Sequence, residues 1–155
     1  MADNRVTLGN VDVDVHALML ALTMAKDAKV GYPEETTGSV IHGEAEVPIA
    51  TLAAWQELGT ENMPPRAFMR QGAEIMVQRR GLMSVHVRRL AAGKMHADRF
   101  MIAMGNLLKS SITAAISRGD FPPLAPETVA AKGHAQILVD SGEMRDALDV
   151  HLDRL

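Results

Sequence analysis

Two adjacent prolines, Pro64 and Pro65, constrain the path of this chain more than any other feature. Neither has a backbone N–H, and each biases the residue before it away from the α-helical region, so no helix can run through them. Before the pair, a helical segment from Ala53 to Leu58 ends at Gly59. After the pair a new helix opens, and Pro65 suits its first turn, where a missing donor costs little. The sequence therefore predicts a rigid corner between two helices.

The corner presents one aromatic and two cationic side chains. Arg66 and Arg70 are four residues apart and are expected to share one face of the second helix, while Phe68 lies on another face. An aromatic anchor beside two guanidiniums on a rigid corner suits a protein–protein joint better than a reaction centre.

Patterns on both sides of the corner indicate an α+β fold with one domain over residues 1–155. Short strands are predicted at 5–8, 29–32, 47–52 and 149–152, and 34–43 reads as an exposed hairpin or loop. Residues 66–118 are mainly helical, with breaks at Gly81 and 91–93 and a long helix over 98–117. Residues 119–155 form a turn-rich C-terminal block. We expect a small mixed sheet of short strands packed with two longer helices, with extended loops or an arm.

Two helix starts depend on capping residues. Asp12 or Asp14 is expected to cap a helix whose apolar positions follow helical spacing, although the alternation over 11–15 fits a strand equally well. Those positions are Val15, Leu18, Met19, Leu22 and Ala25. Near the C-terminus, Asp140 or Ser141 can cap a short helix over 143–148.

Charge is strongly segregated along the chain although the net charge is only −3. Residues 1–65 hold three basic and ten acidic side chains, residues 66–118 hold ten basic and two acidic, and residues 119–155 hold three basic and seven acidic. Such a layout can be satisfied within one subunit, between identical neighbours, or by nucleic acid on the middle segment. Self-complementary pairing is the simpler account, because a dedicated DNA binder usually has a basic total.

The residues that enzymes need are not arranged in any recognisable pattern. The chain has no Cys, which excludes disulfides, Cys-ligated zinc and thiol catalysis, and its six His are scattered without metal-ligand spacing. His134, Asp140 and Ser141 lie near one another in sequence, but turn formation and capping explain them more simply. We therefore expect no catalytic, metal or cofactor site. The N-terminus has no secretory pattern and the apolar run from Ala17 to Ala25 is too short to cross a bilayer, so we expect synthesis in the cytoplasm and no membrane partner.

Two segments together carry a resemblance to a known family. Residues 53–60 and 63–70, AAWQELGT and MPPRAFMR, are similar to the "hEFGt…iPPRPFmR" signature of tail-completion and neck proteins of tailed bacteriophages and Mu-like prophages. Residues 119–133 and 137–148, GDFPPLAPETVAAKG and ILVDSGEMRDAL, resemble the "G.PPLaP.Tl..KG…pLidTGqLr.ai" ending of the same family. Order and spacing also match, so the resemblance covers most of the chain from Val30 onward. Leu58, Ala67 and Ser141 depart from the pattern, where the family has Phe, Pro and Thr.

The resemblance implies a non-enzymatic virion morphogenesis protein, made in the host bacterial cytoplasm and built into the neck or tail top. Such proteins form a homo-oligomeric ring, here expected to be a hexamer, that completes the tail or joins it to the head. Expected partners are the subunit itself, tail-tube or neck and connector proteins, and genomic DNA passing through the lumen. The candidate contact residues are Trp55, Glu57, Pro64, Pro65, Arg66, Phe68, Arg70, Asp140 and Arg145.

Within that ring, we expect Phe68 and Trp55 to pack the corner, and Arg66 and Arg70 to pair with acidic residues of the same or an adjacent subunit. The alternative function is a DNA-contacting packaging or regulatory factor that uses the basic residues 66–118. Against it, Arg79-Arg80 and Arg88-Arg89 lie nine residues apart and fall on opposite sides of an ideal helix.

Overall fold

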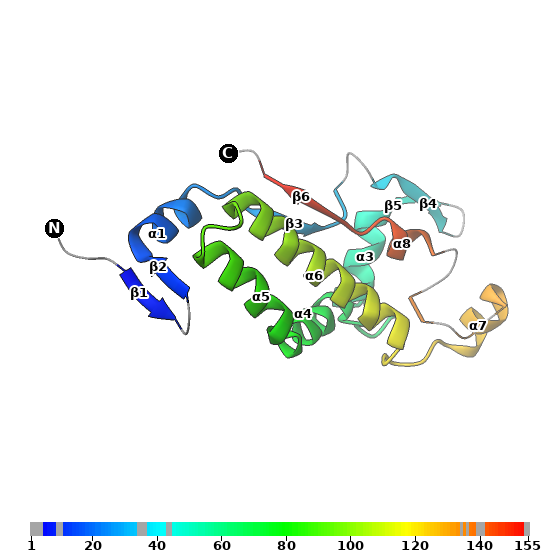
Figure 1. Cartoon of the computed structure of the whole chain (residues 1–155). Coiled ribbons are helices and arrows are strands. Elements are labelled where there is room, and N and C mark those ends of the chain that lie inside the picture. Colours follow the sequence, from blue (N-terminus) through cyan, green and yellow to red (C-terminus); the bar gives the residue numbers. More distant parts are fainter. Residues whose placement is uncertain are drawn as a thin grey trace.

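One long helix, α6 (Ala97–Arg118), forms the spine of the molecule. The structure is a computed structural model that describes residues 5–8, 11–33, 37–42, 45–133, 135, 137–138 and 142–153. Two helices, α4 (Phe68–Gln78) and α5 (Arg80–Ala91), lie along one side of α6 (Figure 1). Strands β3 (Ala28–Gly31) and β6 (Asp149–Leu152) lie along the other side. The spine is therefore held between two helices that precede it in sequence and a strand pair formed by segments from near the two ends of the chain.

The described strands form three separate antiparallel pairs. β1 (Arg5–Leu8) pairs with β2 (Val11–Asp14), β3 with β6, and β4 (Ser39–His42) with β5 (Ala45–Pro48). The β3–β6 pair joins distant parts of the chain, with Ala28 opposite Leu152 and Gly31 opposite Asp149. The α+β class is confirmed. Its strand component is three two-stranded antiparallel units rather than one small mixed sheet, because no described strand has a neighbour on both edges.

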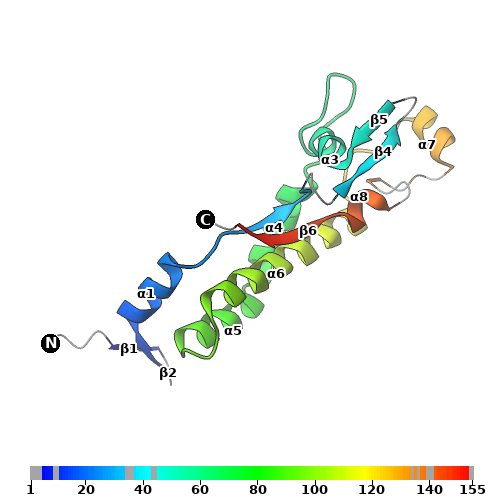
Figure 2. The ribbon, with the colours of Figure 1, turned by 90° about the horizontal axis from the view of Figure 1, so that it is seen from above.

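The N-terminal elements form an arm at one end of the molecule. The β1–β2 pair leads directly into α1 (Val15–Thr23), and Figure 2 shows these elements beyond the end of α5, opposite the end that holds α3, β4–β5 and α7. The Asp14 side chain accepts a hydrogen bond from the Ala17 N–H at 3.0 Å, so Asp14 is both the last residue of a strand and the N-cap of α1. Residues 11–14 therefore form a strand, as the alternation predicted, and the predicted helix begins directly after it at Val15.

The helices around the corner differ from the sequence-based bounds at two places, the start of α3 and the break between α4 and α5. α3 runs from Ile49 to Leu58 and so starts four residues before the predicted Ala53, because Ile49 and Ala53 are both buried on one helical face. The break between α4 and α5 lies at Arg79 rather than at Gly81. α6 was predicted to within one residue at each end, and Gly119 ends it in the left-handed conformation (φ 66°).

The C-terminal block contains two short helices, α7 (Pro126–Lys132) and α8 (Glu143–Asp146). Gly142, in the left-handed conformation with φ 89°, is the N-cap of α8, and no side chain caps that helix. The residues predicted to cap this helix, Asp140 and Ser141, lie outside the described part of the chain, as does His134. α8 also ends two residues before the predicted Leu148, which instead leads into β6 as a fully buried core residue.

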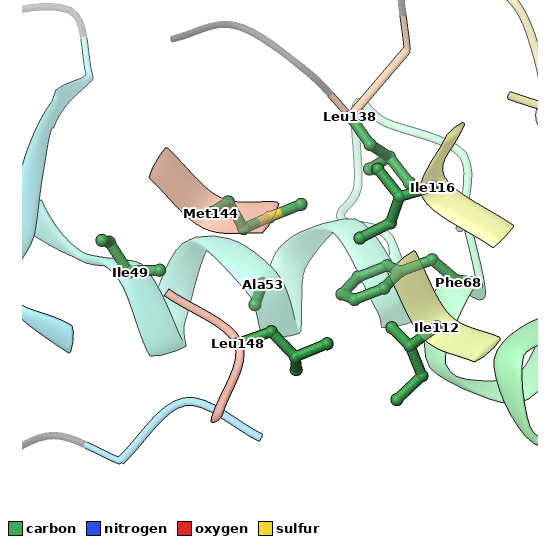
Figure 3. Packing of buried hydrophobic residues seen from close by; sticks show 8 residues of the cluster. All are labelled: Ile49, Ala53, Phe68, Ile112, Ile116, Leu138, Met144 and Leu148. Carbon is green, nitrogen blue, oxygen red and sulfur yellow. The ribbon is translucent and has the colours of Figure 1, made fainter. Parts of the chain in front are cut away.

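The main core fills the space between α3, α4, α6 and α8 (Figure 3). Its buried members are Ile49, Ala53, Phe68, Ile112, Ile116, Leu138, Met144 and Leu148. The length and apolar composition of α6 would also allow it to cross a membrane. Its largest fully buried side chains, Ile112 and Ile116, belong to this core, and the helix packs against α4 and against β3–β6.

Candidate partner-binding surfaces

The proline corner is a tightly closed loop between α3 and α4. Gly59 ends α3 with φ 77°, and a Cβ there would lie 2.8 Å from the Met63 carbonyl oxygen and from the Pro65 nitrogen. Thr60 and Met63 exchange two backbone hydrogen bonds of 2.9 and 3.2 Å. Pro64 and Pro65 are exposed, and α4 begins at Phe68, so Pro65 lies outside the helix rather than in its first turn. The predicted rigidity of the corner agrees with this geometry.

Arg66 is an interior residue and does not act as a surface guanidinium. Only 4% of it is exposed, and its guanidinium donates hydrogen bonds to Gln56 Oε1 at 2.9 Å and to the Pro122 carbonyl oxygen at 3.4 Å. Its backbone N–H also donates to the Gln56 carbonyl at 2.7 Å. Burial lowers the pKa of Arg66 below its usual value. The expectation that Arg66 shares a helical face with Arg70 was wrong, because Arg66 precedes α4. Among the described residues its guanidinium bonds to neutral acceptors and ties α3 to the C-terminal block.

Glu57 has a specific structural task at the corner. Its Oε2 accepts the Met69 N–H at 2.8 Å, and its Oε1 accepts the Arg70 N–H at 3.3 Å. The N-cap residue of α4, Ala67, has no side-chain oxygen, so a carboxylate from α3 satisfies two free N–H groups at the start of α4. A negative charge at that end also complements the helix dipole.

Phe68 is fully buried, and its ring meets Tyr32 edge to face with centroids 6.5 Å apart. It therefore anchors the core of its own subunit rather than a partner. Trp55, with 39% of its surface exposed, and Leu58, at 75%, lie outside the closed corner.

Arg70 is exposed and forms no salt bridge within the part of the chain that the structure describes. Arg145 forms one with its neighbour Asp146 at 2.9 Å, on the surface. Of the predicted contact residues, the structure leaves Trp55, Pro64, Pro65 and Arg70 at the surface around the corner, and gives Glu57, Arg66 and Phe68 internal roles.

The N-terminal arm is a surface that the sequence analysis missed. Helical spacing of apolar residues, as in α1, is typical of a helix that packs one face in a core, but none of the residues of α1 is buried. The most exposed large apolar side chains of this segment are Met24 at 74%, Met19 at 64%, Leu20 at 55% and Leu22 at 43%. The sequence could have indicated this surface, because the segment VHALMLALT is apolar on almost all sides and offers no polar face for solvent.

A second exposed surface combines apolar and basic residues on α5. Leu82, Val85 and Val87 are exposed, as are Arg80, Arg88 and Arg89. Arg79 differs from them, because its guanidinium donates to Ser110 and Ser111 of α6 at 3.2 Å each and so holds the α4–α5 break against α6. The α5–α6 connection also forms a hollow of about 240 Å³ lined by Arg89, Gly93, Lys94, Met95, His96 and Arg99.

Among the residues that the structure describes, no three His, Asp or Glu side chains gather in a way that could hold a metal ion. Comparisons of this chain with protein-family models, with curated proteins and with solved structures find no match.

Proposed function

We propose that this chain is a structural protein of tailed-phage virions, of the tail-completion and neck type, that assembles into a homo-oligomeric ring at the head–tail junction or tail top. The two motifs at 53–70 and 119–148, in the order and spacing of that family, support the assignment. The proposal gives the protein an architectural role with no catalysed reaction, and places its synthesis in the host bacterial cytoplasm.

The exposed apolar surface of α1 is the observation that carries self-assembly. Burying a Leu or Met side chain fully contributes about 1.5–3 kcal/mol, so leaving several of them in water on one short helix forfeits a large part of a small protein's stability. Contiguous apolar patches of this kind mark sites of association. A second subunit that covers α1 accounts for a helix with no buried residue.

Charge supports the same assembly. Seven basic side chains of the middle segment form no salt bridge with any residue that the structure describes. They are Arg70, Arg80, Arg88, Arg89, Lys94, Arg99 and Arg118. The segments before and after the basic middle carry net charges of −7 and −4, from three basic against ten acidic and three against seven. Identical subunits can therefore offer the carboxylates that these cations lack.

Light scattering over a concentration series tests the assembly directly. The wild-type chain is expected to reach a closed multiple, such as a hexamer, while the double variant Met19→Glu/Leu20→Glu stays a monomer with unchanged circular dichroism. Ile41→Glu is the matched control, since Ile41 is equally apolar and 76% exposed but lies on β4. A wild-type monomer at every concentration would remove self-assembly from the proposal.

The virion role has its own test, which is deletion of the gene in the parent phage or tail element followed by electron microscopy. Separate heads and unfinished tails are expected, and restoration of the gene should join them. Normal particles without the gene would contradict the proposal.

The cationic hollow at the α5–α6 connection favours one alternative function, contact with DNA. Arg89, Lys94, His96 and Arg99 all line it, and no carboxylate does. Phosphate contacts by these groups would make binding to duplex DNA fall steeply with salt. Measured binding with such a slope, lost in an Arg89→Ala/Arg99→Ala variant, would favour a DNA-contacting factor.

A further inference from the structure

Among the described residues, exposed large apolar side chains gather mainly in two places, on α1 with Met24 and on the run of α4 and α5 along α6. On α5, Leu82 and Val85 are three residues apart, and Arg88 and Arg89 follow Val85 by three and four residues, so the four share one side of the helix. We call these four residues the α5 stripe. Leu82 is 56% and Val85 51% exposed, whereas Leu90, toward the opposite side, is buried.

The exposed face of α1 does not meet its own subunit. Ala17 and Ala21 lie one turn apart and line a hollow of about 560 Å³ against Leu90 and Ala92 of the same chain. Met19 lies midway between Ala17 and Ala21 in sequence, which places it on the opposite side of the helix, away from that hollow. The outward face of α1 therefore needs a different chain to cover it.

Charge helps to decide whether DNA or the N-terminal arm of another copy covers the α5 stripe. Residues 79–96 contain five basic and no acidic side chains, and residues 1–25 contain three acidic and one basic. Arg88 and Arg89 form no salt bridge within the part of the chain described. A DNA backbone would satisfy these arginines but would leave Leu82 and Val85 in contact with water. An apolar helix that directly follows Asp12 and Asp14 of β2 matches the stripe better, because it offers apolar side chains to Leu82 and Val85 and brings a negatively charged segment near the arginines.

We propose that α1 of one copy of this chain packs its exposed side chains, Met19 and Leu20 among them, on the α5 stripe of the next copy. The contact rests on the proposed function, since it specifies which surfaces join the subunits of the ring. The two surfaces differ, so each pairing is head to tail and leaves one arm and one stripe free at the ends of any open chain. Only a closed ring covers every arm.

Absence of Cys from the natural sequence makes site-directed crosslinking the direct test. Single-cysteine variants are made on the arm (M19C, L20C) and on the stripe (L82C, V85C), purified separately, then mixed in pairs and treated with a flexible bis-maleimide. Because each chain carries one thiol, every crosslinked dimer joins two copies. I41C replaces the stripe variant in the matched control mixture, and light scattering measures the mass of each sample.

The expected result is a crosslinked dimer in the arm-plus-stripe mixtures, absent from either variant alone and from the arm-plus-I41C mixture. An Arg88→Glu/Arg89→Glu change in the stripe partner should lower the yield at least several-fold. Dimers from arm variants alone would overturn the proposal in favour of arm-to-arm pairing. Full oligomers by light scattering without arm-to-stripe crosslinks would overturn it while leaving the ring itself standing. Monomers in every sample would count against both.

Discussion

Gly72 of α4 and Ile112 of α6 bring the two helices into backbone contact: a Cβ on Gly72 would lie 2.6 Å from the Ile112 Cα. A similar approach occurs at Gly105, where a Cβ would overlap the Val150 side chain of β6. Close packing on both sides of α6 therefore requires a glycine, Gly72 of α4 on one side and Gly105 of α6 itself on the other. The close fit at Gly72 also sets the position of Phe68, one turn earlier on α4, in the core.

Gly72→Ala should destabilise the fold. Ala favours a helix over Gly by about 1 kcal/mol, but forced overpacking costs about 1–3 kcal/mol and cannot relax easily, because the atoms in the way include the backbone of Ile112. Gly81→Ala on α5 is the matched control, since nothing lies within 4 Å of a Cβ there. Urea unfolding should show a lower free energy of unfolding for Gly72→Ala and an equal or higher one for Gly81→Ala. Equal values for the two variants would argue against the backbone contact.

Glu57→Ala should lower the free energy of unfolding by about 1 kcal/mol, because the Met69 and Arg70 N–H groups lose their acceptor. Glu61→Ala provides the comparison, because Glu61 is an exposed carboxylate in the loop that follows α3. This change should alter the free energy of unfolding by no more than about 0.5 kcal/mol. Hydrogen exchange should also speed up at the first turn of α4 in the Glu57 variant alone. If Glu61→Ala proved as costly, the cap would have no special role.

Variants of Arg66 and Arg70 should affect different properties, the stability of the monomer for Arg66 and the assembly of subunits for Arg70. Arg66→Ala leaves the acceptors on Gln56 and Pro122 without their donor and should cost about 2–3 kcal/mol, which urea unfolding measures. Arg70→Ala should change monomer stability by less than about 0.5 kcal/mol, so any loss of oligomer mass in that variant reports a subunit contact. Replacing both arginines at once would lower monomer stability as well as any subunit contact, so the two variants are measured separately. A stable Arg66→Ala protein would contradict the internal role of Arg66.

Tyr32 should make stability fall at alkaline pH. Burial, and then the negative charge of Glu57, raise the pKa of this phenol above its ordinary value of 10.0. Its contribution is therefore complete below about pH 10, where the unfolded phenol is still neutral, and is lost as pH rises further. Tyr32 is the only tyrosine, so phenolate absorbance reports it alone, and the titration midpoint should lie above that of unfolded protein.

The buried Tyr32 hydroxyl has no hydrogen-bond partner among the described residues. Tyr32→Phe should therefore leave stability at neutral pH unchanged or slightly raised, since it removes an unsatisfied polar group. The same variant should lack the alkaline loss. A difference in free energy of unfolding between the two proteins that stays constant from about pH 8 to 11 would contradict the linkage.

Sequence patterns predicted well where a few neighbouring residues decide the conformation. Gly59 ends a helix as expected, and both ends of the long helix in the basic segment were placed to within a residue. The strand at 149–152 followed from its alternation, but its partner, β3, lies more than a hundred residues earlier and no local pattern identifies it. The break at Arg79 was missed for a similar reason, because it depends on hydrogen bonds to Ser110 and Ser111.

In the candidate site, too, local residues predicted the backbone conformation, whereas distant contacts decided which side chains are buried. The double proline and the flanking glycine determined a rigid corner by themselves, since they remove donors and restrict backbone angles whatever surrounds them. Only the tertiary structure decided which side chains of that corner face inward. Arg66 is buried because an acceptor on Pro122, 56 residues away, lies within reach of its guanidinium. Likewise, helical spacing determined that α1 forms, but burial depends on what packs against a helix, and in the described chain nothing covers its outer face.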